Sequence, residues 1–253
     1  MPASSAQSSP VALITGGARR IGAAIARRLH SDGFRLVLHC RNSRTEAEEL
    51  ARELGGEAWT SLLCGDLADC DFLANLVSEA AAIHGRLDLL VNNASVYRRM
   101  SLEETSIAEL QSQFLLNCFG PIELMRRFAQ RHQPGCIVNL LDGRIDKCDT
   151  GAAAYLLSKQ SLADATRAAA LEWACYGLRV NGVAPGLVRP ADGVPMERMR
   201  HLLEAIPLRC RSSEEEIAAA VSYLASMPSV TGEILYVDGG LHLADTAIGE
   251  RKP

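Results

Sequence analysis

The sequence predicts a single α/β domain built on a doubly wound parallel sheet, and three observations carry this prediction. Short apolar runs alternate with longer segments of helical periodicity from residue 11 to the C-terminal region. No Pro-, Gly- or Ser-rich linker interrupts that alternation. The chain has 253 residues, 48% of them hydrophobic, which is enough apolar material for one large core. We therefore expect one domain over residues 10–253, with helices on both faces of the sheet.

Seven short apolar runs are the expected strands. They cover residues 11–14, 34–38, 58–64, 87–91, 136–141, 178–183 and 232–237. Six longer segments have the character of helices. They cover residues 20–31, 44–54, 69–84, 107–131, 152–173 and 212–225. The last of them begins with Ser212-Ser213-Glu-Glu-Glu216, a capping-box start, and Met227-Pro228 ends it.

The composition argues against several classes of protein. Twenty-six Lys and Arg residues against 30 Asp and Glu give a formal net charge of −4, which disfavours nucleic acid or an anionic membrane as a partner. No apolar run approaches the roughly 18 residues that a membrane span requires. Residues 1–9 lack the basic start and apolar stretch of a secretory signal, and they predict a short disordered tail.

Eight cysteines are scattered along the chain, none of them in a Cys-x-x-Cys pair, and no histidine cluster has metal-ligand spacing. The even count leaves disulfides open, but free thiols of a reducing compartment are the better prediction for a chain of this length without a signal. We expect a cytoplasmic protein with no metal site.

A glycine-rich turn, Thr15–Gly22, follows the first expected strand and opens the first helix. Gly16 permits a tight turn, and Gly22 permits close packing of the helix. The helix N-terminus offers unpaired N–H groups to a phosphate. A plain strand-to-helix connection is the alternative, but the placement directly after the first strand favours binding of a dinucleotide.

The end of the second strand indicates which cofactor is bound. An NAD site usually has an acidic residue there, whereas this chain has none before Glu46. Arg41, Ser43 and His39 are candidate donors to a 2′-phosphate, as is Arg20 from the first turn. A solvated basic turn is the alternative. Two cationic segments that border the same ribose predict NADPH as the cofactor.

Over residues 10–241 the sequence resembles the short-chain dehydrogenase/reductase family. The matching segments are Thr15–Gly22, Asp66, Asn92-Asn93-Ala94, Asn117, Tyr155-x-x-x-Lys159, Pro185-Gly186 and Val237-Asp238-Gly239-Gly240. The resemblance implies a Rossmann-type fold and a set of cofactor-binding residues. Together with the residues already named in the glycine-rich turn and after the second strand, the expected cofactor-binding residues are Gly16, Arg20, Ile21, Gly22, His39, Arg41, Asn42, Ser43, Asp66, Leu67, Asn93, Ala94, Ser95, Tyr155, Lys159, Pro185 and Gly186.

Within that family the chain looks most like the pteridine reductases. Arg20 replaces the usual middle glycine of the turn, as in those enzymes, and a His-x-x-x-Ser segment runs from His39 to Ser43. Asp142 stands 13 residues before Tyr155, where the wider family has serine. The Asn-Ala-Ser stretch ending at Ser95 is also similar, and Tyr97 stands near the position of an aromatic ring that stacks on the pterin. The segment from His39 lacks the adjacent His-Arg order of those enzymes, and Tyr97 replaces the more usual Phe.

Four side chains are the candidate catalytic residues: Asn117, Asp142, Tyr155 and Lys159. Tyr155 and Lys159 are four residues apart on one helix face, and an ammonium group near a phenol lowers its pKa and makes it a usable proton donor. Taken alone, the pair also fits an ordinary amphipathic helix. Asn117 is polar in an apolar helical stretch; the resemblance implies a water relay toward Lys159, and a core asparagine is the alternative.

Asp142 carries the prediction of specificity. A serine hydroxyl there would polarise a ketone oxygen, whereas a carboxylate would oppose an alkoxide-like transition state. The carboxylate can instead accept hydrogen bonds from N–H groups of a pterin, so it favours reduction of a C=N bond. A plain Asp-Gly turn is the alternative. Ser95, Tyr97, Asp142 and Tyr155 are the expected substrate-binding residues, although Tyr97 alone would fit an aromatic covering a loop.

These observations predict an NADPH-dependent reductase of a pterin C=N bond, with dihydropterin, biopterin and dihydrofolate as candidate substrates. A short-chain carbonyl reductase of the 3-oxoacyl or sugar type is the first alternative, and a non-catalytic NADPH-binding sensor or scaffold is the second. The resemblance implies a homotetramer. Small residues on one helix, Ala163, Ala165, Ala168 and Ala169, suit such close packing, and they suit an intramolecular core equally well.

Overall fold

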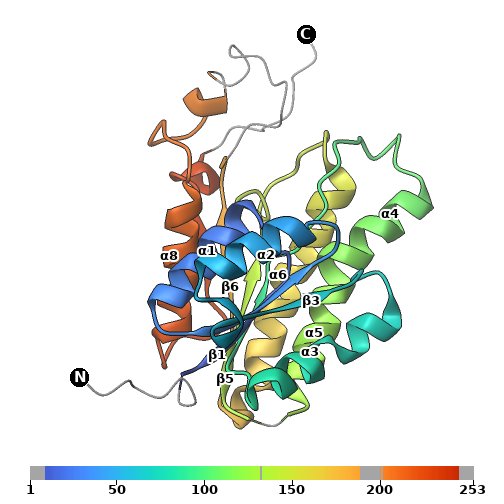
Figure 1. Ribbon diagram of the computed structural model, residues 1–253. Coiled ribbons are helices and arrows are strands. Elements are labelled where there is room, and N and C mark those ends of the chain that lie inside the picture. Colours follow the sequence, from blue (N-terminus) through green and yellow to red (C-terminus); the bar gives the residue numbers. More distant parts are fainter. Residues whose placement is uncertain (1–8, 132, 189–199, 201, 245–253) are drawn as a thin grey trace.

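A computed structural model describes residues 9–131, 133–188, 200 and 202–244, and its centre is a seven-stranded parallel sheet (Figure 1). The strand order is β3-β2-β1-β4-β5-β6-β7, which confirms the predicted doubly wound fold class. The strands are β1 (Val11–Ile14), β2 (Arg35–Cys40), β3 (Thr60–Cys64), β4 (Leu89–Asn92), β5 (Gly135–Leu140), β6 (Leu178–Pro185) and β7 (Ile234–Val237).

Helices cover both faces of this sheet, as predicted (Figure 1). One face is covered by α1 (Arg20–Ser31), α2 (Arg44–Glu53) and α8 (Glu214–Ser226). The other is covered by α3 (Cys70–His84), α5 (Gly120–Ala129) and α6 (Ala153–Glu172), and α4 (Ile107–Phe114) packs beside α6. Each layer closes its own apolar core, and every residue of β1 is buried because both faces of the strand are covered.

One predicted helix, residues 107–131, is interrupted in the structure. It consists of α4, a π-helical turn over Leu115–Phe119 and α5. Pro121 lies in the first turn of α5 and has no N–H to donate to the carbonyl of Asn117, four residues earlier. The turn widens at this point, and Asn117 lies inside it, a placement common for functional residues.

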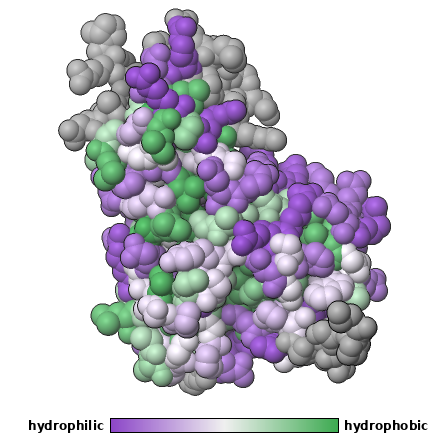
Figure 2. Space-filling model, turned by 90° about the vertical axis from the view of Figure 1, so that its left-hand side faces the viewer, coloured by the Kyte–Doolittle hydropathy of each residue, from purple (hydrophilic) through white to green (hydrophobic). Residues whose placement is uncertain are grey.

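The crevice for a ligand lies where the strand order reverses, between β1 and β4. The loops that follow β1, β2 and β4 all leave the sheet at this carboxyl edge. Among the described residues no helix is both long and apolar enough to span a membrane. On the face nearest α8, hydrophobic residues are interspersed with hydrophilic ones (Figure 2). Except for Ser9, the predicted tail (residues 1–9) lies outside the described residues.

Candidate active site

The turn after β1 has the backbone conformation that its glycines predict. Gly16 has a φ of +61°, in the left-handed region where glycine is favoured. A Cβ at Gly22 would lie 2.2 Å from the carbonyl oxygen of Gly16, so the helix can approach the turn this closely only without a side chain. Asn93, directly after β4, donates from Nδ2 to the oxygens of Thr15 (2.9 Å) and Gly16 (3.0 Å) and holds the turn in place.

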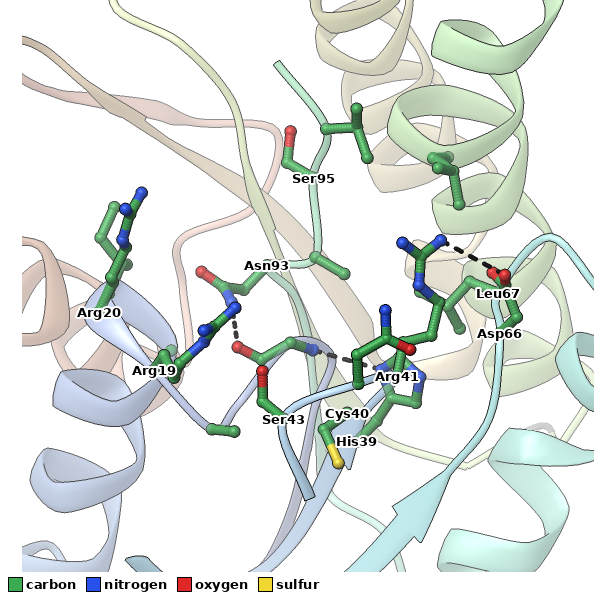
Figure 3. A pocket seen from close by; sticks show the side chains of 18 residues that line it. Arg19, Arg20, His39, Cys40, Arg41, Ser43, Asp66, Leu67, Asn93 and Ser95 are labelled. Atoms are coloured by element: carbon green, nitrogen blue, oxygen red, sulfur yellow. Dashed lines mark hydrogen bonds and ion pairs between the residues drawn. The ribbon is translucent and has the colours of Figure 1, made fainter. Parts of the chain in front are cut away.

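A cavity of about 500 Å³ opens above this turn (Figure 3). Thirteen of the predicted cofactor residues line it: Gly16, Arg20, Ile21, Gly22, His39, Arg41, Asn42, Ser43, Asp66, Leu67, Asn93, Ala94 and Ser95. Five further residues line the cavity that were not predicted as cofactor residues: Ala18, Arg19, Cys40, Val96 and Leu116. Arg19 and Cys40 adjoin predicted cofactor residues, so their position in the same loops could have indicated that they line the cavity. The remaining predicted residues, Tyr155, Lys159, Pro185 and Gly186, lie outside this lining.

Arg20 adopts the left-handed conformation that a glycine would adopt with less strain. Its φ is +52°, a region that costs a non-glycine residue about 1 kcal/mol. The strain brings a guanidinium group to the wall of the cavity. Arg41 also lines the cavity and donates to the Asp66 carboxylate at 3.3 Å, with both side chains about half exposed (50% and 43%).

His39 differs from its predicted role as a donor to a 2′-phosphate. The side chain is buried, its Nδ1 accepts from the Gly16 N–H at 3.3 Å, and its Nε2 lies 3.1 Å from the Gly65 carbonyl oxygen, to which it donates. Burial lowers the pKa of His39, so the neutral ring that this pattern requires is favoured. His39 therefore positions the phosphate turn, and Arg20, Arg41 and Ser43 remain the candidates for phosphate contacts.

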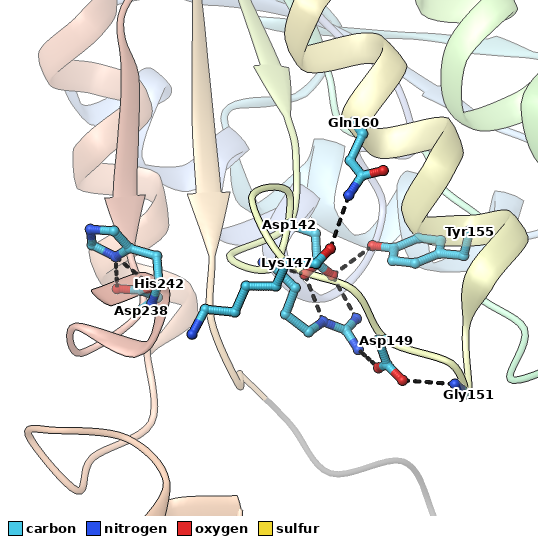
Figure 4. A network of polar contacts seen from close by, with 9 residues as sticks. Asp142, Lys147, Asp149, Gly151, Tyr155, Gln160, Asp238 and His242 are labelled. Atoms are coloured by element: carbon cyan, nitrogen blue, oxygen red, sulfur yellow. Dashed lines mark hydrogen bonds and ion pairs between the residues drawn. The ribbon is translucent and has the colours of Figure 1, made fainter. Parts of the chain in front are cut away.

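Asp142 lies two residues beyond the end of β5, and its carboxylate points toward the Tyr155 hydroxyl (Figure 4). Arg144 holds this carboxylate. Its Oδ1 accepts from the Arg144 backbone N–H at 2.9 Å and from Nε at 2.8 Å. Its Oδ2 accepts from Arg144 Nη2 at 2.9 Å and from the Tyr155 hydroxyl at 3.1 Å. Arg144 Nη1 also donates to Asp149 at 2.6 Å, so one guanidinium bridges two carboxylates.

This pairing determines the charge of Asp142. Burial raises the pKa of the carboxyl, but the hydrogen bonds and positive charge of Arg144 outweigh burial, and the net pKa is lowered. Asp142 is therefore a carboxylate with four hydrogen bonds already made. A pterin N–H could bond to it only by replacing one of them. Arg144 and Asp149 are not among the residues predicted from the sequence, and the only signal for Arg144 was its position two residues after Asp142.

Tyr155 and Lys159 lie in the first half of α6, but the predicted acidification of Tyr155 by Lys159 is wrong for this structure. Burial and the neighbouring Asp142 carboxylate raise the pKa of Tyr155 well above its usual value. Lys159 Nζ donates instead to the carbonyl oxygen of Leu140 at 2.7 Å. Burial lowers the pKa of Lys159 to about 8. Tyr155 is thus a protonated phenol whose hydroxyl points at Asp142.

Asn117 makes its hydrogen bonds to the loop after β4 and to α4. Its Oδ1 accepts from the Ser95 hydroxyl and the Val96 N–H, both at 2.9 Å. Its Nδ2 donates to the Val96 oxygen at 2.9 Å and to Gln113 at 3.1 Å. Asn117 therefore ties the π-helical turn to the loop after β4, close to the core-asparagine alternative. Its water relay toward Lys159 stays a prediction.

Tyr97 lies beside the Asp142–Tyr155 pair. Its ring is 4.8 Å from the Tyr155 ring, edge to face, and 46% of the residue is exposed. The Arg144 guanidinium lies 5.8 Å from its centroid. Pro185 is nearby, because its oxygen accepts from Gly143 at 2.7 Å. The predicted substrate residues Tyr97, Asp142 and Tyr155 are therefore brought together. No cluster of three or more potential metal ligands occurs in the part of the chain that the structure describes.

The chain is similar in sequence to known reductases. The family model described as enoyl-(acyl carrier protein) reductase matches residues 16–242. Pteridine reductase 1 of Leishmania tarentolae is 33% identical over 280 residues, covering 93% of this chain and 97% of that protein. The human 3-oxoacyl-(acyl-carrier-protein) reductase is 35% identical over 237 residues, covering 92% and 98%.

The structure also resembles a solved structure of a reductase. The crystal structure of alternative dihydrofolate reductase 1 (FolM) of Brucella suis in complex with NADP is 32% identical, with a TM-score of 0.87 over 96% of this chain and 99% of that one. A similar fold thus occurs together with sequence similarity along nearly the whole chain. The chain therefore belongs to the short-chain dehydrogenase/reductase family and is an oxidoreductase of that family.

Proposed function

We propose that this protein is an NADPH-dependent reductase of a C=N bond in a pterin. The observation that carries the proposal is the charged Asp142 bound to the Tyr155 hydroxyl at 3.1 Å, where the wider family has a serine hydroxyl. The half-exposed Tyr97 ring next to Tyr155 supplies a flat apolar surface for a bicyclic heterocycle. Similarity to a pteridine reductase and to two alternative dihydrofolate reductases supports the same substrate class.

The cofactor is NADPH, and the residues of the 500 Å³ cavity fit it. Gly16 and Gly22 leave the backbone of the phosphate turn open to a pyrophosphate, while Arg20, Arg41 and Ser43 border the place for a 2′-phosphate. Lys159 is the expected partner of the nicotinamide ribose hydroxyls. NADPH supplies the hydride of the reduction.

The protein side chains manage the substrate and its proton. Tyr97 stacks on the pterin, and Asp142 accepts one of the pterin N–H groups in place of the bond now made by the Tyr155 hydroxyl. The phenol that this releases is free to donate its proton to a ring nitrogen of a fully oxidised pterin. Arg144 keeps Asp142 ionised throughout, so Asp142 acts as an acceptor and Tyr155 as the proton donor. For a dihydropterin, water is the expected proton source.

Reduction of a ketone is the second candidate function, and Arg144 is the observation that favours it. The guanidinium offsets the negative charge of Asp142, which weakens the repulsion that a developing alkoxide would otherwise meet. Relatives of this kind include the human 3-oxoacyl-(acyl-carrier-protein) reductase at 35% identity and that of Staphylococcus aureus at 30%.

A substrate panel separates the two functions. NADPH oxidation is followed with biopterin, dihydrobiopterin, dihydrofolate, a 3-oxoacyl thioester and a simple ketone. We expect turnover of the pterins or of dihydrofolate and little of the two carbonyl compounds. Turnover of the carbonyl compounds alone would contradict the proposal.

Asp142→Ser is expected to lose pterin turnover, and a gain of ketone turnover in this variant would point to the carbonyl reductases. Tyr155→Phe with every activity intact would instead indicate a non-catalytic NADPH-binding protein.

We also propose that the protein is a cytoplasmic homotetramer. Phe119, Leu157 and Leu171 are 54%, 42% and 84% exposed, and they supply apolar surface for contacts between copies. Ala163 and Ala169, in contrast, are buried in the core of the chain itself, which supports their intramolecular role. Sedimentation equilibrium at micromolar protein tests the tetramer, and a monomer mass would contradict it.

A further inference from the structure

Two cysteines stand side by side at the carboxyl edge of the sheet. Cys40 ends β2 and Cys64 ends β3, and the two residues are paired in the parallel register. Their sulfur atoms are 3.4 Å apart. Cys40 is 2% exposed and lines the cofactor cavity, whereas Cys64 is exposed on the edge strand.

We propose that Cys40 and Cys64 form a reversible disulfide when the protein meets a peroxide, and that this bond weakens binding at the cofactor cavity. Neighbouring parallel strands lie about 4.8 Å apart, which falls within the range of Cα separations that a disulfide spans. Both thiols already point toward each other. The sulfur atoms must approach from 3.4 Å to about 2.05 Å, a movement that side-chain rotation and a small strand adjustment can supply.

The oxidation proceeds in two balanced steps. The Cys64 thiol loses its proton, and the thiolate attacks one oxygen of hydrogen peroxide, forming an S–O bond, breaking the O–O bond and releasing hydroxide. The Cys40 sulfur then attacks the Cys64 sulfenic acid, forming the S–S bond and breaking the S–O bond. The leaving hydroxide takes the Cys40 proton. In sum, two thiols and one peroxide give a disulfide and two waters.

The environments of the two thiols assign these roles. Burial and the adjacent Cys64 raise the pKa of Cys40 to about 12, so Cys40 is a poor first nucleophile and peroxide reaches it poorly. Cys64 is accessible from solvent. Once Cys64 has become a neutral sulfenic acid, no thiolate charge remains there to oppose ionisation of Cys40.

The bond acts on the cofactor through the position of the Cys40 side chain. Cys40 packs with Ala18 of the phosphate turn and Ala47 of α2, and Arg41 and Ser43 follow it in the chain. Drawing its sulfur toward Cys64 removes it from this contact and shifts the segment that carries Arg41. NADPH binding should therefore weaken, and bound NADPH should in turn slow the oxidation. The effect on NADPH rests on the cofactor assignment above but does not depend on the substrate.

The test uses the full chain with hydrogen peroxide, followed by alkylation of remaining thiols and peptide mass mapping without reductant. We expect a Cys40–Cys64 cross-linked peptide, an increase of about fivefold or more in the Kd of NADPH measured by fluorescence, and full recovery with dithiothreitol. Cys64→Ser should bind NADPH normally and lose the peroxide response. Cys70→Ser is the matched control, because Cys70 is another exposed thiol and should leave the response intact.

Two outcomes would overturn the inference. Oxidation of Cys64 to sulfinic acid without the cross-link would refute the disulfide, and a cross-link with unchanged NADPH affinity would refute its effect on the cavity. Failure of the pterin proposal would leave both measurements untouched. Failure of the cofactor assignment would be visible at the outset, as an absence of NADPH binding by the reduced protein.

Discussion

Arg144 is the residue on which the chemistry of the candidate site depends. It pairs with two carboxylates, its guanidinium lies 5.8 Å from the centre of the Tyr97 ring, and its side chain is only 17% exposed. An unpaired carboxylate at such a position would be partly desolvated, so its proton would be held more tightly. The ionisation of Asp142 is therefore a property of the pair and not of the aspartate alone.

Arg144→Gln should destabilise the protein and shift its pH dependence. Loss of the guanidinium leaves Asp142 and Asp149 without their partner, which costs about 3 kcal/mol of unfolding free energy in urea titrations. Because the folded-state pKa of Asp142 is lowered in the wild type, activity that needs the carboxylate is lost only as the pH falls through that low pKa. In the variant this pKa rises, so the acid limb of kcat/KM should move to higher pH.

The matched control is Arg167→Gln, which breaks an exposed ion pair of 3.2 Å with Asp164. It should change stability by less than about 1 kcal/mol and leave the pH profile alone. An unchanged acid limb in Arg144→Gln would show that Arg144 does not set the charge of Asp142.

Arg20→Gly separates backbone strain from recognition of the cofactor. Glycine removes the strain of φ +52°, but it also loses more conformational entropy on folding, so stability should change by less than about 1 kcal/mol. Loss of one charged partner of the 2′-phosphate should raise the Kd of NADPH about tenfold and leave the Kd of NADH nearly unchanged. Equal weakening of both cofactors would place Arg20 away from the 2′-phosphate.

At the scale of elements, the π-helical turn between α4 and α5 positions Asn117. A continuous helix would present this side chain in a different direction, away from the loop after β4. The π-helical turn lets one amide join Ser95, Val96 and Gln113. The helix pair and the β4 loop are therefore positioned relative to each other by one buried side chain.

Asn117→Ala should weaken the contact between the π-helical turn and the loop after β4 and lower the free energy of unfolding. It leaves the partly buried N–H and carbonyl of Val96 without their side-chain partner, which costs about 2 kcal/mol in urea unfolding. Because Ser95 lines the cofactor cavity, the Kd of NADPH should rise as well. Asn75→Ala removes one exposed hydrogen bond to the Asp71 oxygen, and as a control it should cost less than about 0.5 kcal/mol. Equal stability of the two variants would contradict the role of Asn117.

At the scale of the whole molecule, the buried His39 and the half-buried His84 link stability to pH. Burial lowers the pKa of both His39 and His84, so the unfolded chain binds protons that the folded chain does not as the pH falls through about 6.5. The free energy of unfolding should therefore decrease between pH 7.5 and pH 5, by up to about 1.4 kcal/mol per pH unit for each group.

Urea titrations at pH 7.5, 6 and 5 measure this slope. His39→Gln should reduce it, because glutamine does not titrate in this range. A free energy of unfolding that is constant or rises on acidification would refute the linkage.

Local patterns were sufficient for most of the fold. The apolar runs predicted all seven strands, and the first helix begins and ends where its periodicity predicts, at Arg20 and Ser31. The predicted helix over 107–131 was wrong in its middle, although Pro121 was a visible signal. β2 extends past its predicted end to Cys40, because its last residues pair with Leu63 and Cys64 of β3, which propensity does not report.

The alternation of elements, the glycine turn and the Tyr155–Lys159 spacing could all be predicted from the chain alone, because each depends on residues that are close in sequence. How the side chains share their hydrogen bonds depends on tertiary packing. His39 bonds to Gly16 and Gly65, where the sequence predicted a bond to a phosphate. The Tyr155 hydroxyl donates to Asp142, which Arg144 also holds. The physical reason is that a buried polar group must satisfy its bonds with whatever packing brings near, and packing joins segments that no local pattern relates.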